Sequence, residues 1–122
     1  MEKLTNKEEE IMQVLWKIKR GFVKDIIELL PEPKPHYNTV STIIRKLEKK
    51  GFVAHKAYGK THEYYPIIPK KNYRNAVIQK AVKNYFENSY KNLVVFFAKE
   101  EKIDAEELKE IIRIIEKSKD KS

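Results

Sequence analysis

The stretch between residues 37 and 51 restricts the fold more than any other part of the chain, because it has two unlike sides. On a helix with about 100° between successive residues, its apolar side chains gather on one side and its polar side chains on the other. The apolar side consists of Val40, Ile43, Ile44 and Leu47. The polar side consists of Asn38, Thr42, Arg45 and Lys49, flanked by Ser41 and Lys46. The pattern predicts a helix that packs on a core and exposes small polar and basic groups.

Two helices are predicted before this one. Thr5 and Glu8 have the spacing of a capping box, in which each side chain bonds a free backbone N–H of the other's turn, and an apolar stripe follows as far as Ile18. Residues 23–30 form a second helix of barely two turns, which ends at Pro31 because proline cannot continue a helix. A stiff, proline-rich connector then leads to the third helix.

A β-hairpin is predicted directly after the third helix. Residues 52–58 and 61–68 are rich in aromatic and β-branched side chains, and Gly59 and Lys60 between them suit a tight turn. From residue 72 onward the pattern is helical, so we place a domain boundary near residue 70. Three helices followed by a hairpin, with a polar and basic third helix, is the order of a winged helix-turn-helix domain.

The second part of the chain is predicted to form three helices that pair with a second copy. Asp104 and Glu107 form a capping box, and Ser89 suits the start of the helix before it. About fifty residues are too few to bury so many large apolar groups alone, since a core below about 70–80 residues is marginal. The side chains expected in the dimer core are Leu93, Val94, Phe96, Phe97, Leu108, Ile111, Ile112 and Ile115.

These patterns together predict a mainly α (α+β) protein with two domains. Residues 1–70 are expected to form a winged-helix DNA-binding domain, and residues 71–122 a three-helix dimerisation domain.

The net charge indicates a polyanionic partner. There are 26 Lys and Arg residues against 18 Asp and Glu residues, a net +8, and such a balance favours nucleic acid. Residues 34–60 hold seven basic residues and one acidic residue, which is +6 of that total. A helix of this kind fits the major groove of DNA. The residues predicted to contact DNA are Tyr37, Asn38, Thr39, Ser41, Thr42, Arg45, Lys46, Lys49, Lys56, Tyr58 and Lys60.

Within this surface, different side chains are expected to read bases and to bind phosphates. Short polar groups approach base edges closely, and the Arg45 guanidinium can donate two parallel hydrogen bonds to a guanine. Lys46 and Lys49 act as point charges, and the hairpin side chains meet the neighbouring backbone. Arg45 is therefore the predicted determinant of sequence preference.

The sequence excludes several other chemistries. It has no cysteine, hence no disulfide, thiolate metal site or cysteine nucleophile. His36, His55 and His62 lack metal-site spacing and are interpreted as phosphate contacts or solvated residues. No cofactor, metal or catalytic residue is assigned, and the chain is not expected to be an enzyme. Without a run of about 18 apolar residues, no membrane insertion is expected, and the predicted location is the cytoplasm.

Several stretches resemble the BlaI/MecI family of bacterial repressors. The resemblance implies a homodimer that binds a palindromic operator and blocks transcription, often of antibiotic-resistance genes. The matching stretches cover nearly the whole chain: Leu4-Thr5-Asn6-Lys7-Glu8, Met12 to Trp16, Tyr37-Asn38-Thr39-Val40-Ser41-Thr42, Leu47 to Val53, Tyr64-Tyr65-Pro66, Leu93 to Phe97 and the final capped helix.

The resemblance also implies a route of release from DNA. In better-known members, a membrane sensor with a metalloprotease domain triggers cleavage in the dimerisation region, commonly at an Asn-Phe bond. The matching pair here is Phe96-Phe97, which lacks the asparagine. A membrane sensor protease, or a protease downstream of it, is thereby an implied partner, with Phe96 and Phe97 at the corresponding cleavage point.

Two other classes of function are alternatives to a repressor. A winged-helix protein-interaction module would present the same basic helix to an acidic protein and bind DNA only weakly, without sequence preference. A small nuclease would need a cluster of carboxylates or histidines near the basic helix to hold a metal, and we find no such cluster in the sequence.

Overall fold

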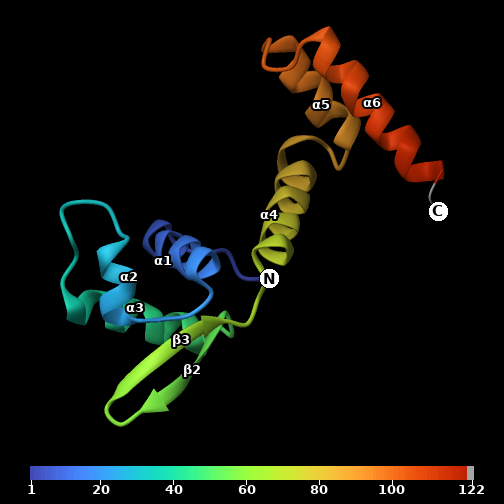
Figure 1. The fold of residues 1–122 in the computed structure, drawn as a ribbon. Helices are drawn as coiled ribbons and strands as arrows, with labels where there is room; N and C mark the ends of the chain where they lie inside the picture. Colours follow the sequence, from blue (N-terminus) through green and yellow to red (C-terminus); the bar gives the residue numbers. More distant parts are fainter. Residues whose placement is uncertain (121–122) are drawn as a thin grey trace. The chain divides into compact units, whose positions relative to one another are not determined.

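A computed structural model describes the chain over residues 1–120, with side chains to residue 118, and it contains two compact units. The first unit is Met1–Val77, and the second begins at Ile78 (Figure 1). The elements in chain order are α1 (Asn6–Ile18), β1 (Gly21–Phe22), α2 (Val23–Glu28), α3 (Tyr37–Lys49), β2 (Val53–Tyr58), β3 (Thr61–Pro66), α4 (Lys70–Tyr85), α5 (Tyr90–Lys99) and α6 (Ala105–Asp120). The predicted order of three helices and a hairpin is present.

The first helix begins at the predicted capping box. The Thr5 hydroxyl accepts from the Glu8 N–H at 3.2 Å, and the Thr5 N–H donates to the Glu8 carboxylate at 2.9 Å. The helix ends at Ile18 because Lys19 takes the left-handed conformation, with φ of 74°. Gly21 follows in close packing, since a Cβ there would lie 2.8 Å from Ile18 Cδ1. A Cβ at position 21 would require the Ile18 side chain to shift.

A short strand that is not predicted from the sequence completes the sheet. β1 pairs antiparallel with β3, with Gly21 opposite Tyr64, so the strand order is β1-β3-β2. Two residues are too few to show an alternating pattern, which explains why this strand was missed. The predicted hairpin is confirmed, with Gly59 in its turn at φ of 62° and Pro66 at the end of β3.

The second helix is shorter than predicted. It ends at Glu28 instead of Leu30. The Lys34 ammonium donates to the carbonyl oxygen of Glu28 at 2.8 Å and also to that of Leu30, so it satisfies acceptors that a helix end leaves free. One of the seven basic residues between positions 34 and 60 therefore stabilises the fold.

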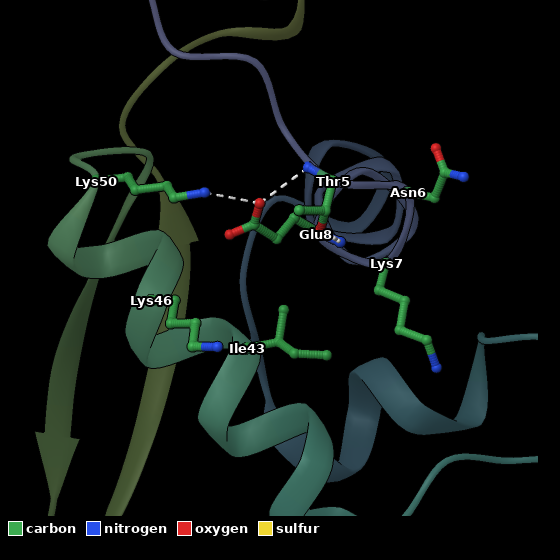
Figure 2. A pocket seen from close by; sticks show the side chains of 7 residues that line it. All are labelled: Thr5, Asn6, Lys7, Glu8, Ile43, Lys46 and Lys50. Atoms are coloured by element: carbon green, nitrogen blue, oxygen red, sulfur yellow. Dashed lines mark hydrogen bonds and ion pairs between the residues drawn. The ribbon is translucent and has the colours of Figure 1, made fainter.

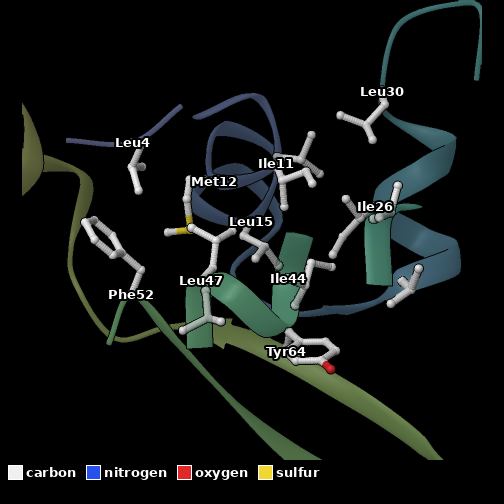
Figure 3. Packing of buried hydrophobic residues seen from close by; sticks show 14 of the residues in the cluster. Leu4, Ile11, Met12, Leu15, Ile26, Leu30, Ile44, Leu47, Phe52 and Tyr64 are labelled. Atoms are coloured by element: carbon white, nitrogen blue, oxygen red, sulfur yellow. The ribbon is translucent and has the colours of Figure 1, made fainter. Parts of the chain in front are cut away.

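The core of the first unit lies between the three helices and the inner side of the hairpin (Figure 3). The predicted apolar side of α3 faces this core, with Ile43 half-buried and the other three side chains buried. Burial of a large apolar side chain stabilises the fold by about 1.5–3 kcal/mol. The fully buried side chains of this unit are Met12, Leu15, Ile26, Val40, Ile44, Leu47, Phe52 and Val53.

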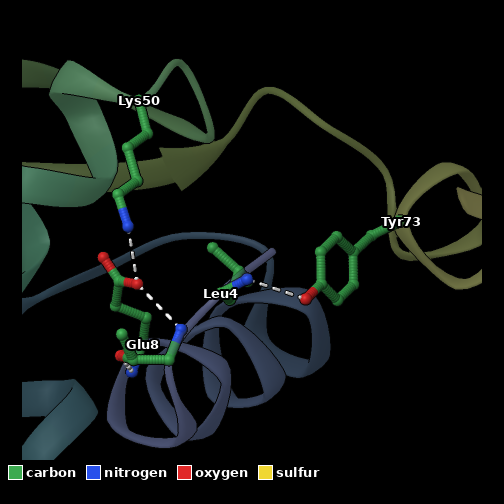
Figure 4. A network of polar contacts seen from close by, with 5 residues as sticks. Leu4, Glu8, Lys50 and Tyr73 are labelled. Carbon is green, nitrogen blue, oxygen red and sulfur yellow. Dashed lines mark hydrogen bonds and ion pairs between the residues drawn. The ribbon is translucent and has the colours of Figure 1, made fainter. Parts of the chain in front are cut away.

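The start of α4 belongs to the first unit. The Tyr73 side chain is buried, and its ring centroid lies 5.9 Å from that of Trp16 and 5.7 Å from that of Phe52. Its hydroxyl accepts a hydrogen bond from the Leu4 N–H at 3.0 Å (Figure 4). The compact units accordingly divide after Val77, whereas the change of pattern in the sequence predicts a boundary near residue 70.

Tyr73→Phe is expected to lower the free energy of unfolding by about 1–2 kcal/mol, because it leaves the Leu4 N–H buried without an acceptor. The ring and its aromatic contacts stay. Urea unfolding followed by the fluorescence of Trp16, the chain's one tryptophan, measures the change. Tyr65→Phe, on an exposed ring, is the matched control and should leave the midpoint unchanged. Equal midpoints for both variants would show that the Leu4 bond contributes nothing.

The second unit keeps most of its large apolar side chains exposed. Val82 is the one fully buried apolar side chain among the described residues of this unit, whereas Tyr85 is 80% exposed. The predicted caps are present, since Ser89 Oγ accepts from the Asn92 N–H at 3.1 Å and Asp104 caps α6. None of the helices in residues 1–120 is long and apolar enough to cross a membrane.

Candidate nucleic-acid interface

The outward side of α3 carries most of the residues predicted to contact DNA. Because its inner side is anchored in the core by Val40, Ile44 and Leu47, this helix holds its outer side chains on a fixed support. Ser41 is half-buried. The exposed α3 residues of the predicted set are Tyr37, Asn38, Thr39, Thr42, Arg45, Lys46 and Lys49.

Two of these polar side chains are positioned by bonds to their own helix. The Thr42 hydroxyl donates to the Asn38 carbonyl at 2.8 Å, which leaves its oxygen as an acceptor toward a ligand. Arg45 Nε donates to the Ser41 carbonyl at 3.4 Å. Within the described residues, the two terminal nitrogens of Arg45 have no hydrogen-bond partner. They can therefore donate a pair of parallel hydrogen bonds to one planar acceptor group.

The wing, which is the hairpin of β2 and β3, adds a second exposed basic surface. The predicted contact residues Lys56, Tyr58 and Lys60 are all exposed. The Lys56 ammonium lies 5.3 Å from the centroid of the Tyr58 ring, and this ring packs edge-on against Phe22 at 5.8 Å. Tyr58 is thus held against Phe22 of β1 and also lies close to the Lys56 cation.

A contact that is not predicted from the sequence connects the wing to α3. Glu48 Oε2 lies 2.6 Å from His55 Nδ1, and the His62 ring stacks on the His55 ring at 4.0 Å between centroids. His55 was interpreted as a phosphate contact or a solvated residue; here it is half-buried and bonds Glu48. Among the described residues, no group of three His, Asp or Glu side chains is placed to hold a metal ion. The contact links the wing to the end of α3.

The tyrosine beneath this contact is part of the core. Tyr64 is buried, and its ring lies 5.7 Å from the His55 ring and 6.1 Å from the His62 ring. Burial raises the pKa of Tyr64, and the nearby Glu48 charge raises it further, so its hydroxyl stays protonated at neutral pH.

A buried carboxylate joins the start of α1 to the end of α3. Glu8 is 3% exposed, and its Oε1 accepts from the Lys50 ammonium at 2.8 Å and from the Thr5 N–H (Figure 4). Burial alone would raise the pKa of Glu8, but these hydrogen bonds and the charge of Lys50 bring it below its ordinary value. The bond to Glu8 raises the pKa of Lys50 in turn.

The basic charge of residues 34–60 is therefore divided between two tasks. Lys34 and Lys50 bond groups within the fold. The five remaining basic residues, all exposed, are the ones predicted to contact DNA: Arg45, Lys46, Lys49, Lys56 and Lys60.

Glu8→Gln is expected to destabilise the fold at neutral pH, and the difference from the unchanged protein should shrink below a pH of about 4.5. Glutamine can keep the capping box but offers no charge to Lys50. Because the pKa of Glu8 is lowered by folding, its ionised form stabilises the fold above the unfolded-state pKa, and this contribution disappears as the pH falls through the folded-state value. Urea unfolding at several pH values measures it; a constant difference would contradict the assignment.

The residues predicted for the dimer core lie on α5 and α6, and most are exposed in the single chain. Leu93 and Leu108 are half-buried. The implied cleavage pair lies within α5, where the rings of Phe96 and Phe97 are 5.4 Å apart, and Phe86 adds a third ring 5.5 Å from Phe96. The exposed members of the predicted set are Val94, Phe96, Phe97, Ile111, Ile112 and Ile115, and the structure adds Val95 and Ile114.

Three helices, a three-stranded sheet and an anchored, outwardly polar third helix define a winged helix-turn-helix domain, and this confirms the predicted fold class. A model of the penicillinase repressor family matches residues 4–117. The chain belongs to this family of DNA-binding repressors, which confirms the resemblance seen in the sequence.

Individual relatives agree with this assignment. The methicillin resistance regulatory protein MecI of Staphylococcus aureus strain N315 is 25% identical over 115 residues, covering 93% of this chain and 94% of the relative. The penicillinase repressor of Bacillus licheniformis is 24% identical over 119 residues, covering 97% and 93%. The solution structure of the DNA binding domain of the repressor BlaI superposes with a TM-score of 0.51 at 28% identity, covering 60% of this chain and 94% of that domain.

Proposed function

We propose that this chain is a sequence-specific transcriptional repressor that binds a palindromic operator as a homodimer in the cytoplasm. The observation that carries the proposal is the outward side of α3. It presents a guanidinium, small polar groups and ammonium groups on a helix that is anchored in the core. A helix of this width fills the major groove, where base edges carry a distinct pattern of donors and acceptors.

The homodimer is supported by the exposed apolar side chains of the second unit. Ile112, Ile114 and Ile115 are each at least half exposed on α6, and Phe96 is 44% exposed on α5. A monomer rarely exposes so many neighbouring apolar groups, and a second copy offers the same surface in return. Two recognition helices related by a two-fold axis read two half-sites of a palindrome.

The proposed targets are genes of antibiotic resistance. This part of the proposal is supported by the similarity over more than nine-tenths of the chain to a methicillin resistance regulatory protein and to a penicillinase repressor.

Selection of bound sequences from a random duplex pool tests the proposal. At near-physiological salt we expect one two-fold symmetric site to be enriched, and sedimentation of the complex on that site to give two chains per duplex. The Kd for the selected site should be at least about 10³ times lower than for random DNA. A pool that never enriches, together with weak binding that vanishes as salt rises, would instead favour a module that presents α3 to an acidic protein.

A further inference from the structure

The first turn of α1 and the wing lie on opposite sides of α3. Around the helix, Glu48 precedes Lys49 by about 100° and Lys50 follows it by about 100°. Glu48 bonds His55 of the wing, and Lys50 bonds Glu8 of α1. Lys49, on the outward side, therefore lies between two flanking elements.

A hollow of about 400 Å³ lies between the first turn of α1 and α3 (Figure 2). Its α1 side carries Asn6 and Lys7, and its α3 side carries Ile43 and Lys46. Figure 2 shows Lys7 and Lys46 on either side of Ile43. Both lysines are exposed, and neither takes part in an ion pair with another described residue. Since Glu8 and Lys50 neutralise each other, two uncompensated positive charges remain at the rim of the hollow, whose own surface is mostly apolar.

DNA in the major groove would place a phosphate backbone along each side of α3. The groove is about 12 Å wide and a helix is about 10–12 Å across, so both strands approach the helix closely. The wing lies on one side and can meet one strand. The hollow lies on the other side, where the second strand would pass.

We propose that Lys7 and Asn6 of α1, together with Lys46 of α3, bind a backbone phosphate of the DNA strand that borders α3 on the side away from the wing. This inference rests on the proposed DNA binding and extends the interface to an element outside the helix-turn-helix and the wing. Contacts to both strands fix the rotation of α3 in the groove, because a helix held from one side alone can still roll. The Glu8–Lys50 pair positions α1 for this contact.

Lys7→Ala tests the site, and Lys17→Ala is its matched control. Lys17 is an exposed lysine on the same helix, about 15 Å further along it, so both variants remove one charge from α1. Kd is measured for the full chain on the selected operator and on random duplex over a range of salt concentrations. We expect Lys7→Ala to weaken binding to both DNAs about equally and to reduce the slope of log K against log salt by less than about 0.9 for each chain, because Lys46 still partly neutralises the same phosphate.

Lys17→Ala should leave both the affinity and the slope unchanged. In the Lys7→Ala, Lys46→Ala double variant, the factor by which DNA affinity falls should be smaller than the product of the factors for the two single variants, because both lysines neutralise the same phosphate. Equal slopes for Lys7→Ala and the unchanged protein would overturn the site, even where the protein selects a palindrome. Failure of the unchanged protein to enrich any sequence would instead overturn the proposed sequence-specific function, and the loss of slope would then still report a phosphate site.

Discussion

Ile111→Asp is expected to convert the proposed homodimer into monomers and to weaken operator binding by about 10²- to 10⁴-fold. Ile111 is 40% exposed on α6 of the single chain, within the apolar side predicted to meet a second copy. A two-fold interface would bury the new carboxylate twice, and a buried charge without a partner is strongly unfavourable. Each half-site is then bound separately, so the gain from linking two binding units is lost.

Arg113→Asp is the matched control for this prediction. It places the same side chain on the same helix about 200° around from Ile111, among the exposed polar positions. This variant should remain a dimer and keep its operator affinity. Sedimentation velocity gives the mass of each variant, and titration of the operator gives its Kd. An Ile111→Asp protein that still sediments as a dimer would show that the interface lies elsewhere.

Arg45→Ala is expected to lower operator affinity by about 1–3 kcal/mol and to relax the preference at one operator position. The guanidinium is held at Nε by its own helix, which leaves its terminal nitrogens for a forked contact with a guanine. Lys60→Ala, at the turn of the wing, should instead weaken binding to operator and random DNA about equally. Repeating the sequence selection and the salt series with each variant separates base reading from phosphate binding.

Arg45→Lys makes this comparison sharper, since it keeps the charge and removes the fork. It should bind random DNA as the unchanged protein does, yet lose the same base preference as Arg45→Ala. If Arg45→Ala and Lys60→Ala lowered affinity for operator and random DNA by the same factor, both side chains would be phosphate contacts and base reading would belong to another residue of α3.

Local patterns predicted most of the secondary structure. The capping boxes at Thr5 and Asp104 place helix starts that need only neighbouring residues to form. The two sides of α3 follow from helical geometry, and the hairpin turn follows from the backbone freedom of Gly59. The exposure of the predicted α3 and wing residues could be anticipated from the same patterns. Polar groups are expected on the side of an element that faces away from the core.

The contacts that organise the interface depend on residues far apart in the sequence. Glu8 meets Lys50 and Tyr73 meets Leu4 only after α1, α3 and α4 have packed around one core, and no periodic pattern links such pairs. β1 exists because β3 supplies its hydrogen bonds. Propensity, capping and periodicity act over a few residues and thus determined the helices, the hairpin and the basic side of α3 from the chain alone. Tertiary packing decided which lysines form bonds within the fold, how the wing is held to α3, and where the hollow beside α1 lies. The reason is that ion pairs and buried hydrogen bonds form between whichever groups the core brings together.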